Sequence, residues 1–175
     1  MFTRSVSKIL ILVLLFAAIS AFVFSRANAA GVFPAFTSKT LDGNTITNKI
    51  FANKKLTMVN IWATWCPPCV SEMPDLGRLG KSMPEGTQLI GLVYDVTASD
   101  QSAKGEANRI LSGAKALFTQ IEYSKDMTPY MKGVDAIPTT IFVDSKGNII
   151  GEPLVGSRPE KEYRAAIEKA LASLR

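Results

Sequence analysis

The sequence predicts an α/β fold in which a central mixed β-sheet is flanked by helices. Residues 57–63 and 88–96 are apolar runs with the length of strands that are buried on both faces. Each run is followed by a segment whose apolar residues recur at helical spacing. Alternating strands and helices favour parallel βαβ units, and a hairpin signal nearer the C-terminus adds antiparallel strands. We expect one domain over residues 30–175, preceded by a targeting segment.

The domain is predicted to open with an N-terminal β-hairpin. Residues 36–40 and 45–47 flank Asp42-Gly43-Asn44, which is a turn signal. After the first buried strand, Pro67-Pro68 favours a helix start, because the first N–H groups of a helix have no partner inside it. Pro74 lies inside this helix and is expected to kink it.

The second strand is followed by a predicted amphipathic helix over residues 103–118, which we interpret as an insertion with its apolar face in the core. That face consists of Ala103, Ala107, Ile110, Leu111, Ala114, Leu117 and Phe118. The last third of the chain is predicted to contain shorter elements. They are a strand at 121–124, a helical turn at 127–132, two hairpin strands at 139–144 and 148–155, and a helix that begins at Pro159.

Residues 1–29 have the pattern of an export signal. Arg4 and Lys8 precede an apolar run over residues 9–24, and Ala27-Asn28-Ala29 matches a signal-peptidase site, so that Ala30 would begin the mature chain. The alternative is an uncleaved membrane anchor. A helix of this length spans about 24 Å, which is less than the roughly 30 Å of a hydrocarbon core. Both alternatives predict a domain that works outside the cytoplasm, in the periplasm or on the outer face of the cell membrane.

Charge and composition exclude several classes of function. Three of the 20 basic residues precede residue 30, where there is no acidic residue, so 17 basic and 15 acidic residues remain. Nucleic acid is therefore not indicated as a partner. The chain contains no histidine, which excludes a Cys-His or Ser-His pair, a histidine metal site and a Cys-x-x-Cys-His haem attachment. We expect no metal or other cofactor.

The two cysteines of the chain, Cys66 and Cys69, stand between the first buried strand and its helix. A cysteine at the start of a helix is acidified by the dipole and by free N–H groups. Because prolines occupy the two positions between the cysteines, only the Cys69 N–H can donate to the Cys66 sulfur from within the motif. We expect Cys66 to attack a substrate disulfide and Cys69 to resolve the resulting mixed disulfide.

Two other roles for the pair are less consistent with the sequence. Half of a zinc site would need further Cys or His ligands, and the chain has none. A structural disulfide closing so short a loop would constrain the unfolded chain very little. We therefore interpret Cys66 and Cys69 as a redox-active disulfide.

Two separated motifs carry a resemblance to a known family. Residues 59–69 read Val-Asn-Ile-Trp-Ala-Thr-Trp-Cys-Pro-Pro-Cys and are followed by Ser71-Glu72-Met73-Pro74, and residues 137–144 read Ile-Pro-Thr-Thr-Ile-Phe-Val-Asp before Gly147-Asn148-Ile149. Together these resemble the thioredoxin superfamily, and within it the extracytoplasmic TlpA/ResA-like thiol-disulfide oxidoreductases. The resemblance covers most of residues 32–173 and implies a thioredoxin-like fold.

The resemblance also implies roles for residues outside the cysteine pair. It implies that Pro138 has a cis peptide bond and that Ile137 and Pro138 hold an extended substrate beside the cysteines. Trp65 is expected to border this substrate groove, whereas Trp62 is expected in the core. Asn60 stands where cytosolic thioredoxins have a buried aspartate.

Glu72 matches a glutamate that serves in ResA-like members. It is expected either to tune Cys69 or accept its proton, or to be an ordinary solvated helix residue.

The activity implied by the resemblance is reduction of disulfides in exported proteins, for example during cytochrome c maturation. The implied electron donor is a membrane thiol-transfer protein, and we expect a monomer with or without a membrane anchor. An oxidase that donates disulfides is the alternative within the same class. A copper-delivery protein would normally need histidine or another Cys spacing, and a peroxidase would need a different sequence before Cys66.

Overall fold

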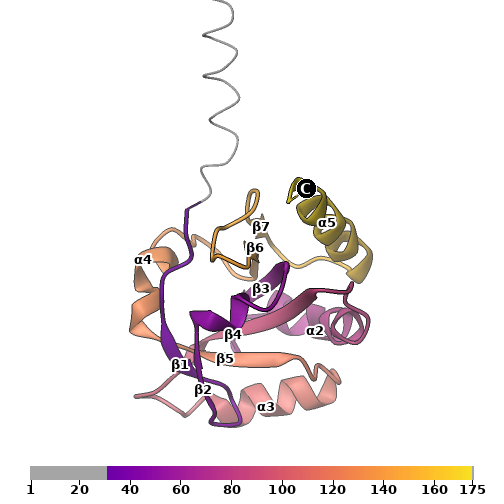
Figure 1. Ribbon diagram of the computed structural model, residues 1–175. Coiled ribbons are helices and arrows are strands. Elements are labelled where there is room, and N and C mark those ends of the chain that lie inside the picture. The colour runs from indigo at the N-terminus through magenta and orange to yellow at the C-terminus, as the bar shows by residue number, and fades with distance from the viewer. Residues whose placement is uncertain (1–30, 175) are drawn as a thin grey trace, which may run out of the picture.

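The computed structural model describes residues 31–174, so the predicted export signal at 1–29 lies outside the described residues. Its centre is a five-stranded sheet with the order β5-β4-β3-β6-β7 (Figure 1). The strands are β3 (Leu56–Trp62), β4 (Thr87–Thr97), β5 (Thr119–Tyr123), β6 (Thr139–Asp144) and β7 (Leu154–Val155). Strands β3, β4 and β5 are parallel, and β6 and β7 are antiparallel to their neighbours. The mixed sheet flanked by helices is therefore confirmed.

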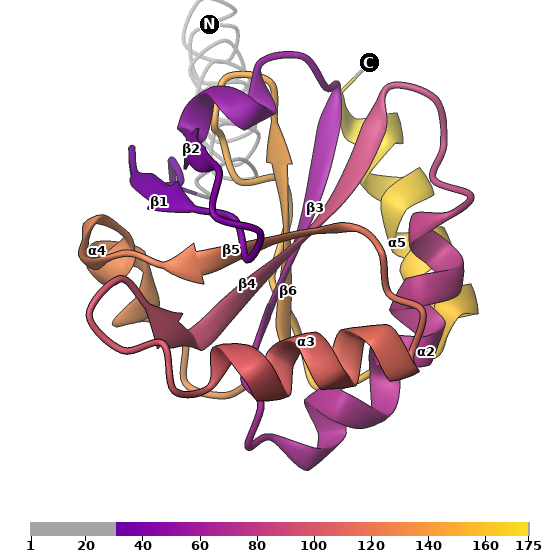
Figure 2. The same cartoon turned by 90° about the horizontal axis from the view of Figure 1, so that it is seen from below.

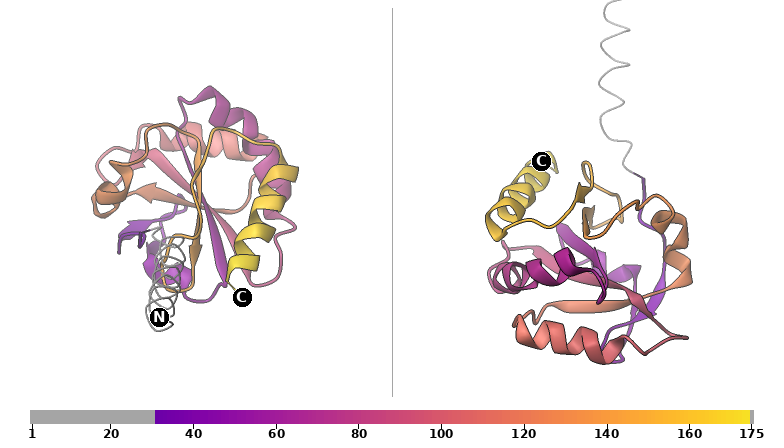
Figure 3. Two further views of the ribbon diagram at one scale, coloured as in Figure 1. Left: turned by 90° about the horizontal axis from the view of Figure 1, so that it is seen from above. Right: turned by 180° about the vertical axis from the view of Figure 1, so that it is seen from behind.

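Helices and a small second sheet cover the two faces of the central sheet. They are the hairpin strands β1 (Thr37–Lys39) and β2 (Thr45–Thr47), the short turns η1 (Asn48–Phe51) and η2 (Lys125–Met127), and the helices α2 (Pro67–Gly80), α3 (Lys104–Gly113), α4 (Thr128–Met131) and α5 (Glu160–Ser173). Figure 2 shows the strands crossing between α2 and α5 on one side and β1, β2 and α4 on the other. In both views of Figure 3, α2 and α5 lie side by side.

Strand β3 separates two hydrophobic cores. All seven of its residues are buried, because it has a hydrogen-bonded neighbour on each edge and a covered face on each side. Met58 and Trp62 face α2, α3 and α5. Val59 and Ile61 face the other way, toward the N-terminal segment with Phe33, Phe36 and Phe51 and toward η2. The period-two alternation of a strand thus divides one apolar run between the two cores.

Most predicted elements are confirmed, and the inserted helix is the main correction. The predicted helix over 103–118 ends at Gly113, because Lys115 adopts a left-handed φ of 53°. The N–H of Ala116 donates to the carbonyl of Leu111 and the N–H of Lys115 to that of Ser112, which is a Schellman end. Leu117 is consequently 84% exposed rather than buried.

The predicted strand over 148–155 is also wrong in part. After the Asp144–Asn148 turn, the N–H of Ile150 donates a hydrogen bond to the Phe142 carbonyl. The pairing is then interrupted at Gly151, whose φ is 71°, and resumes only over the two residues of β7. Among residues 31–174, no helix is both long enough and apolar enough to cross a membrane.

Two amide side chains and a glycine lie side by side on three neighbouring strands, on the face of the sheet that carries α2. Asn60 on β3 pairs with Gly91 on β4, and Gly91 pairs with Gln120 on β5. The Gln120 side chain lies over Gly91 and accepts a 3.0 Å hydrogen bond from the buried indole Nε1 of Trp62. Because a Cβ at Gly91 would lie 1.9 Å from Gln120 Oε1, this arrangement requires glycine.

We predict that Gly91→Ala displaces the Gln120 amide and leaves the Trp62 N–H without its acceptor. The free energy of unfolding should fall by about 1–3 kcal/mol, the usual cost of an unsatisfied buried donor. Urea denaturation of both proteins measures the change. Gly105→Ala is the matched control, because nothing lies within 4 Å of a Cβ at that helical position; it should be neutral or mildly stabilising. An equally stable Gly91→Ala variant would contradict the assignment.

Candidate active site

The two cysteines form a disulfide at the start of α2. Cys66 is the N-cap residue, and its Sγ accepts a 3.3 Å hydrogen bond from the Cys69 N–H. Pro67 and Pro68 occupy the first turn and have no N–H to offer. Cys66 is only 4% exposed but lines a groove, whereas Cys69 is completely buried and does not line it. The geometry therefore makes Cys66 the sulfur that a substrate can approach and Cys69 the sulfur behind it.

The loop before β6 lies against Cys66. The Ile137–Pro138 peptide bond is cis, as the resemblance implies, and the Ile137 carbonyl oxygen lies 3.6 Å from Cys66 Sγ. The groove between this loop and the start of α2 encloses about 490 Å³. Trp65 borders it and is 64% exposed, while Trp62 is in the core, so the structure places the two tryptophans as expected.

Glu72 is 3% exposed, which excludes an ordinary solvated glutamate. Its Oε1 accepts from Asn60 Nδ2 at 2.9 Å. Its Oε2 accepts from the Tyr163 hydroxyl at 2.7 Å and from the Arg158 N–H at 3.1 Å. Three donors from β3, α5 and the loop before α5 thus meet one carboxylate on α2. Cys69 is not among the hydrogen-bond partners of Glu72 within residues 31–174. The expected role of Glu72 toward Cys69 therefore stays a prediction.

Burial governs the ionisation of this cluster. Loss of hydration raises the pKa of Glu72, and the hydrogen bonds from Tyr163, Asn60 and Arg158 offset only part of that rise. Burial and the neighbouring carboxylate also raise the pKa of Tyr163, so its hydroxyl remains a donor. Asn60 Nδ2 donates a second bond to Thr140 Oγ1 at 3.1 Å.

A second carboxylate holds the chain just before Cys66. Asp95, near the carboxyl end of β4, accepts from the Thr64 N–H at 3.1 Å and from the Thr64 hydroxyl at 2.5 Å. Because β3 and β4 are parallel neighbours, their carboxyl ends meet at one edge of the sheet. The contact fixes the turn between β3 and α2, and with it the position of Cys66.

Asp95, Tyr163 and Arg158 were missed by sequence reasoning as members of the site. The helical spacing of α5 predicted a buried face that includes Tyr163, but spacing carries no information about the partner of its hydroxyl. Arg158 contributes its backbone N–H, and because almost every residue type has this group, the sequence does not reveal such a contact. The position of Asp95 at the end of the strand parallel to β3 was a usable signal, because it follows from the βαβ topology.

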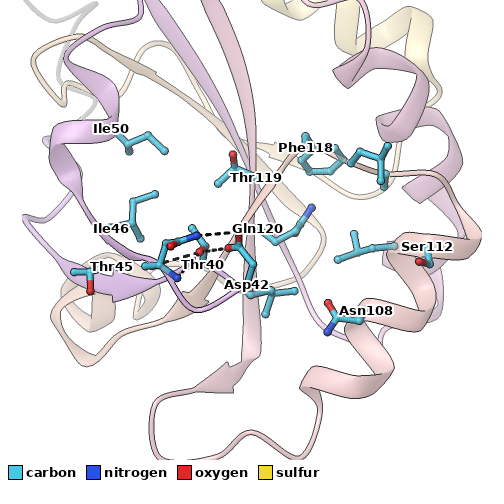
Figure 4. A pocket seen from close by; sticks show the side chains of 15 residues that line it. Thr40, Asp42, Thr45, Ile46, Ile50, Asn108, Ser112, Phe118, Thr119 and Gln120 are labelled. Carbon is cyan, nitrogen blue, oxygen red and sulfur yellow. Dashed lines mark hydrogen bonds between the residues drawn. The ribbon is translucent and has the colours of Figure 1, made fainter.

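A larger hollow than the groove beside Cys66 lies elsewhere. It encloses about 800 Å³ between the hairpin turn, α3 and β5 (Figure 4). Its labelled side chains include Thr40, Asp42, Asn108, Ser112 and Gln120, and no cysteine lines it. Of the two cysteines, Cys66 lines the smaller groove beside Ile137.

This fold and a disulfide at a helix start beside a cis-proline define a thioredoxin-like thiol-disulfide oxidoreductase. The chain belongs to the Redoxin family, whose sequence profile matches residues 28–167. It is 30% identical over 135 residues to the thioredoxin-like protein YneN of Bacillus subtilis, covering 77% of this chain and 76% of that protein. It is 29% identical over 137 residues to the thiol-disulfide oxidoreductase ResA of Bacillus anthracis, covering 78% and 75%.

A further relative is named for the same activity, and a solved structure has the same fold. A thiol:disulfide interchange protein DsbE homolog of Paracoccus denitrificans is 30% identical over 145 residues, covering 80% of this chain and 75% of that protein. The crystal structure of a thioredoxin-family thiol:disulfide interchange protein from Chlorobium tepidum superposes with a TM-score of 0.66 at 23% identity, covering 81% and 97% of the two chains. The expected membership among ResA-like oxidoreductases is thereby confirmed.

We predict that Glu72 makes stability pH-dependent above pH 4.5. Its pKa in the folded protein is raised above the ordinary value of 4.5. At a pH between the ordinary and the folded-state pKa, the folded protein therefore binds more protons than the unfolded chain. The free energy of unfolding must then fall as the pH rises from about 4.5 through the folded-state pKa. Urea denaturation of the oxidised protein from pH 4 to pH 8 measures this fall.

Glu72→Gln should abolish this fall, because the introduced amide does not ionise. The oxygen of the introduced amide can accept from Tyr163 and Arg158. Asn60 Oδ1 has no partner among the described residues. If the Asn60 amide rotates by about 180°, this oxygen can accept from the NH₂ of the introduced amide. Glu168→Gln, at an exposed position of α5, is the control and should keep the wild-type slope. A slope that is unchanged in Glu72→Gln would exclude Glu72 as its source.

Proposed function

We propose that this chain reduces disulfides in exported proteins outside the cytoplasm, as a monomer. The observation that carries the proposal is the asymmetry of the pair. Cys66 lines the groove and its Sγ accepts the Cys69 N–H, while Cys69 is completely buried and lies behind it. In the reduced protein, the same N–H and the positive end of the α2 dipole stabilise a Cys66 thiolate. An export pattern in residues 1–29 supports the location.

The reaction proceeds in two exchanges. The Cys66 thiolate attacks one sulfur of the substrate disulfide; a Cys66–substrate bond forms, and the other substrate sulfur leaves as a thiolate that takes up a proton. Cys69 then loses its proton and attacks Cys66 Sγ, which closes the Cys66–Cys69 bond and releases the second substrate thiolate. Two electrons pass from the chain to the substrate, and the product is the disulfide form of the site.

The return of the protein to its dithiol form requires two electrons from another thiol pair. We assign this role to a membrane thiol-transfer protein, and the substrates to apoproteins such as those of cytochrome c maturation. Both assignments rest on the ResA-like membership of the chain. The opposite direction, donation of disulfides, is distinguished by the reduction potential, because strong oxidants lie near −120 mV and thioredoxin lies near −270 mV; we expect a value on the thioredoxin side.

The direct test is capture of the substrate on Cys66. In the native cell, Cys69→Ser leaves the first exchange intact but removes the resolving sulfur, so mixed disulfides with exported proteins should accumulate. Cys66→Ser is the matched control and should accumulate none, because the remaining sulfur is buried. Accumulation on Cys66→Ser instead would reverse the assigned roles, and an absence of exported partners on Cys69→Ser would refute the proposed substrate class.

We further propose that Glu72 assists the second exchange by accepting the Cys69 proton or by setting the pKa of Cys69. Glu72 lies one helical turn after Cys69 on α2, and both side chains are buried there. We predict that Glu72→Gln slows resolution of the mixed disulfide about a hundredfold, the lower end of the range for a lost general base, and removes one ionisation from its pH profile. Stopped-flow mixing with a model disulfide measures both exchanges. The first exchange serves as the internal control, and an unchanged second exchange would assign Glu72 to stability alone.

A further inference from the structure

The groove beside Cys66 contains a single charged side chain. Its walls are formed by Trp65, Cys66, Pro67, Pro68, Tyr94, Met131, Val134, Asp135, Ala136 and Ile137. Asp135 stands two residues before Ile137, on the loop that leads to Pro138, and is exposed. Within residues 31–174 its carboxylate is engaged in none of the hydrogen bonds or ion pairs of the structure. A negative charge is therefore available at the place where a substrate chain must pass to reach Cys66.

Asp95 and Lys132 are adjacent in sequence to residues that line the groove, but neither lines it itself. Asp95 lies beside Tyr94 but is committed to Thr64 through both of its oxygens. Lys132 is exposed on the same loop, yet it is not among the residues that line the groove. Asp135 is therefore the one charged side chain among the described residues that line the groove, and the apolar walls around it screen its charge less than bulk water would.

The other walls are suited to apolar side chains. Trp65 and Tyr94 are 64% and 40% exposed, and both large aromatic side chains line the groove together with Cys66. Tyr94 is braced by Tyr123, with ring centroids 5.2 Å apart. Exposed aromatic residues that flank a groove are typical anchors for a partner chain, because they bury much area at a small entropic cost.

We propose that the groove selects a substrate cysteine that has an aromatic or aliphatic neighbour and a lysine or arginine placed to reach Asp135. The occupant is thus an extended, basic segment of a disulfide-containing exported protein. The inference rests on the proposed function and narrows it to a substrate class. Asp135 acts as a specificity-determining residue, and its charge influences encounter and binding rather than the exchange of sulfurs.

The experiment compares three peptides of one sequence, each joined through its cysteine to the same reporter thiol. The three peptides differ only in having Lys, Gln or Glu at one position near the cysteine. The comparison is repeated with this position moved along the peptide, before and after the cysteine. The second-order rate of reduction by the full chain is divided by the rate of the same peptide with dithiothreitol, which removes differences in the intrinsic reactivity of the disulfide. At low salt the Lys peptide should exceed the Glu peptide by about three- to tenfold at one position, and 1 M salt should remove the difference.

Variants then assign the preference to one side chain. Asp135→Asn should equalise the three peptides, and Asp135→Lys should invert their order. Glu85→Gln makes the same change of charge before β4, at the end of the sheet opposite to Cys66, and should keep the wild-type preference. Equal rates for all peptides in the wild type, or a preference that survives Asp135→Asn, would overturn the inference. The Gln peptide tests the proposed function separately, because its reduction does not depend on the charge of Asp135.

Discussion

The site depends on one hydrogen bond, from the Cys69 N–H to Cys66 Sγ at 3.3 Å. It is the only such bond that the Cys-Pro-Pro-Cys sequence permits within the motif, because neither proline has an N–H. The prolines do not weaken the helix at this point, since the first-turn N–H groups have no partner inside a helix. Of the two N–H groups that normally donate to an N-cap side chain, those of the second and third helical residues, Pro68 removes the first and leaves that of Cys69. The sulfur is thus stabilised by a single backbone group and by the helix dipole.

The topology of the sheet explains how distant residues reach this sulfur. Strand β6 runs antiparallel to β3, with Thr139 opposite Ile61. The residue before β6 must therefore lie beside the residue after β3, and this places Ile137 and Pro138 next to the start of α2. Strand β4 runs parallel to β3, so its carboxyl end brings Asp95 to the same edge. The antiparallel neighbour β6 thus supplies Ile137 and Pro138 on one side of the site, and the parallel neighbour β4 supplies Asp95 on the other.

Sequence reasoning anticipated the backbone of this arrangement better than its polar contacts. The cysteine pair, the strand before it and the helix after it follow from residue types whose physical meaning is local. Pro138 was placed only through a resemblance, because an isolated X-Pro sequence favours trans. The end of α3 was missed because periodicity continued beyond Lys115, where one left-handed residue stops the helix. The contacts of Asp95 and Tyr163 depend on tertiary geometry, which no spacing within a single element reports.

The cluster around Glu72 shows what replacing the thioredoxin aspartate by Asn60 changes. An amide at that position cannot ionise, so the ionisable carboxyl group that contacts this part of β3 stands on α2, one turn after Cys69. An ionised Glu72 requires donors, and Asn60 must therefore turn its Nδ2 toward Glu72 Oε1. This leaves Asn60 Oδ1 without a partner among the described residues. A protonated Glu72 reverses the preference, because its hydroxyl needs an acceptor and Asn60 Oδ1 can supply one. The orientation of one buried amide is therefore coupled to the charge of Glu72, and through Thr140 this coupling extends to β6, the strand that follows Pro138.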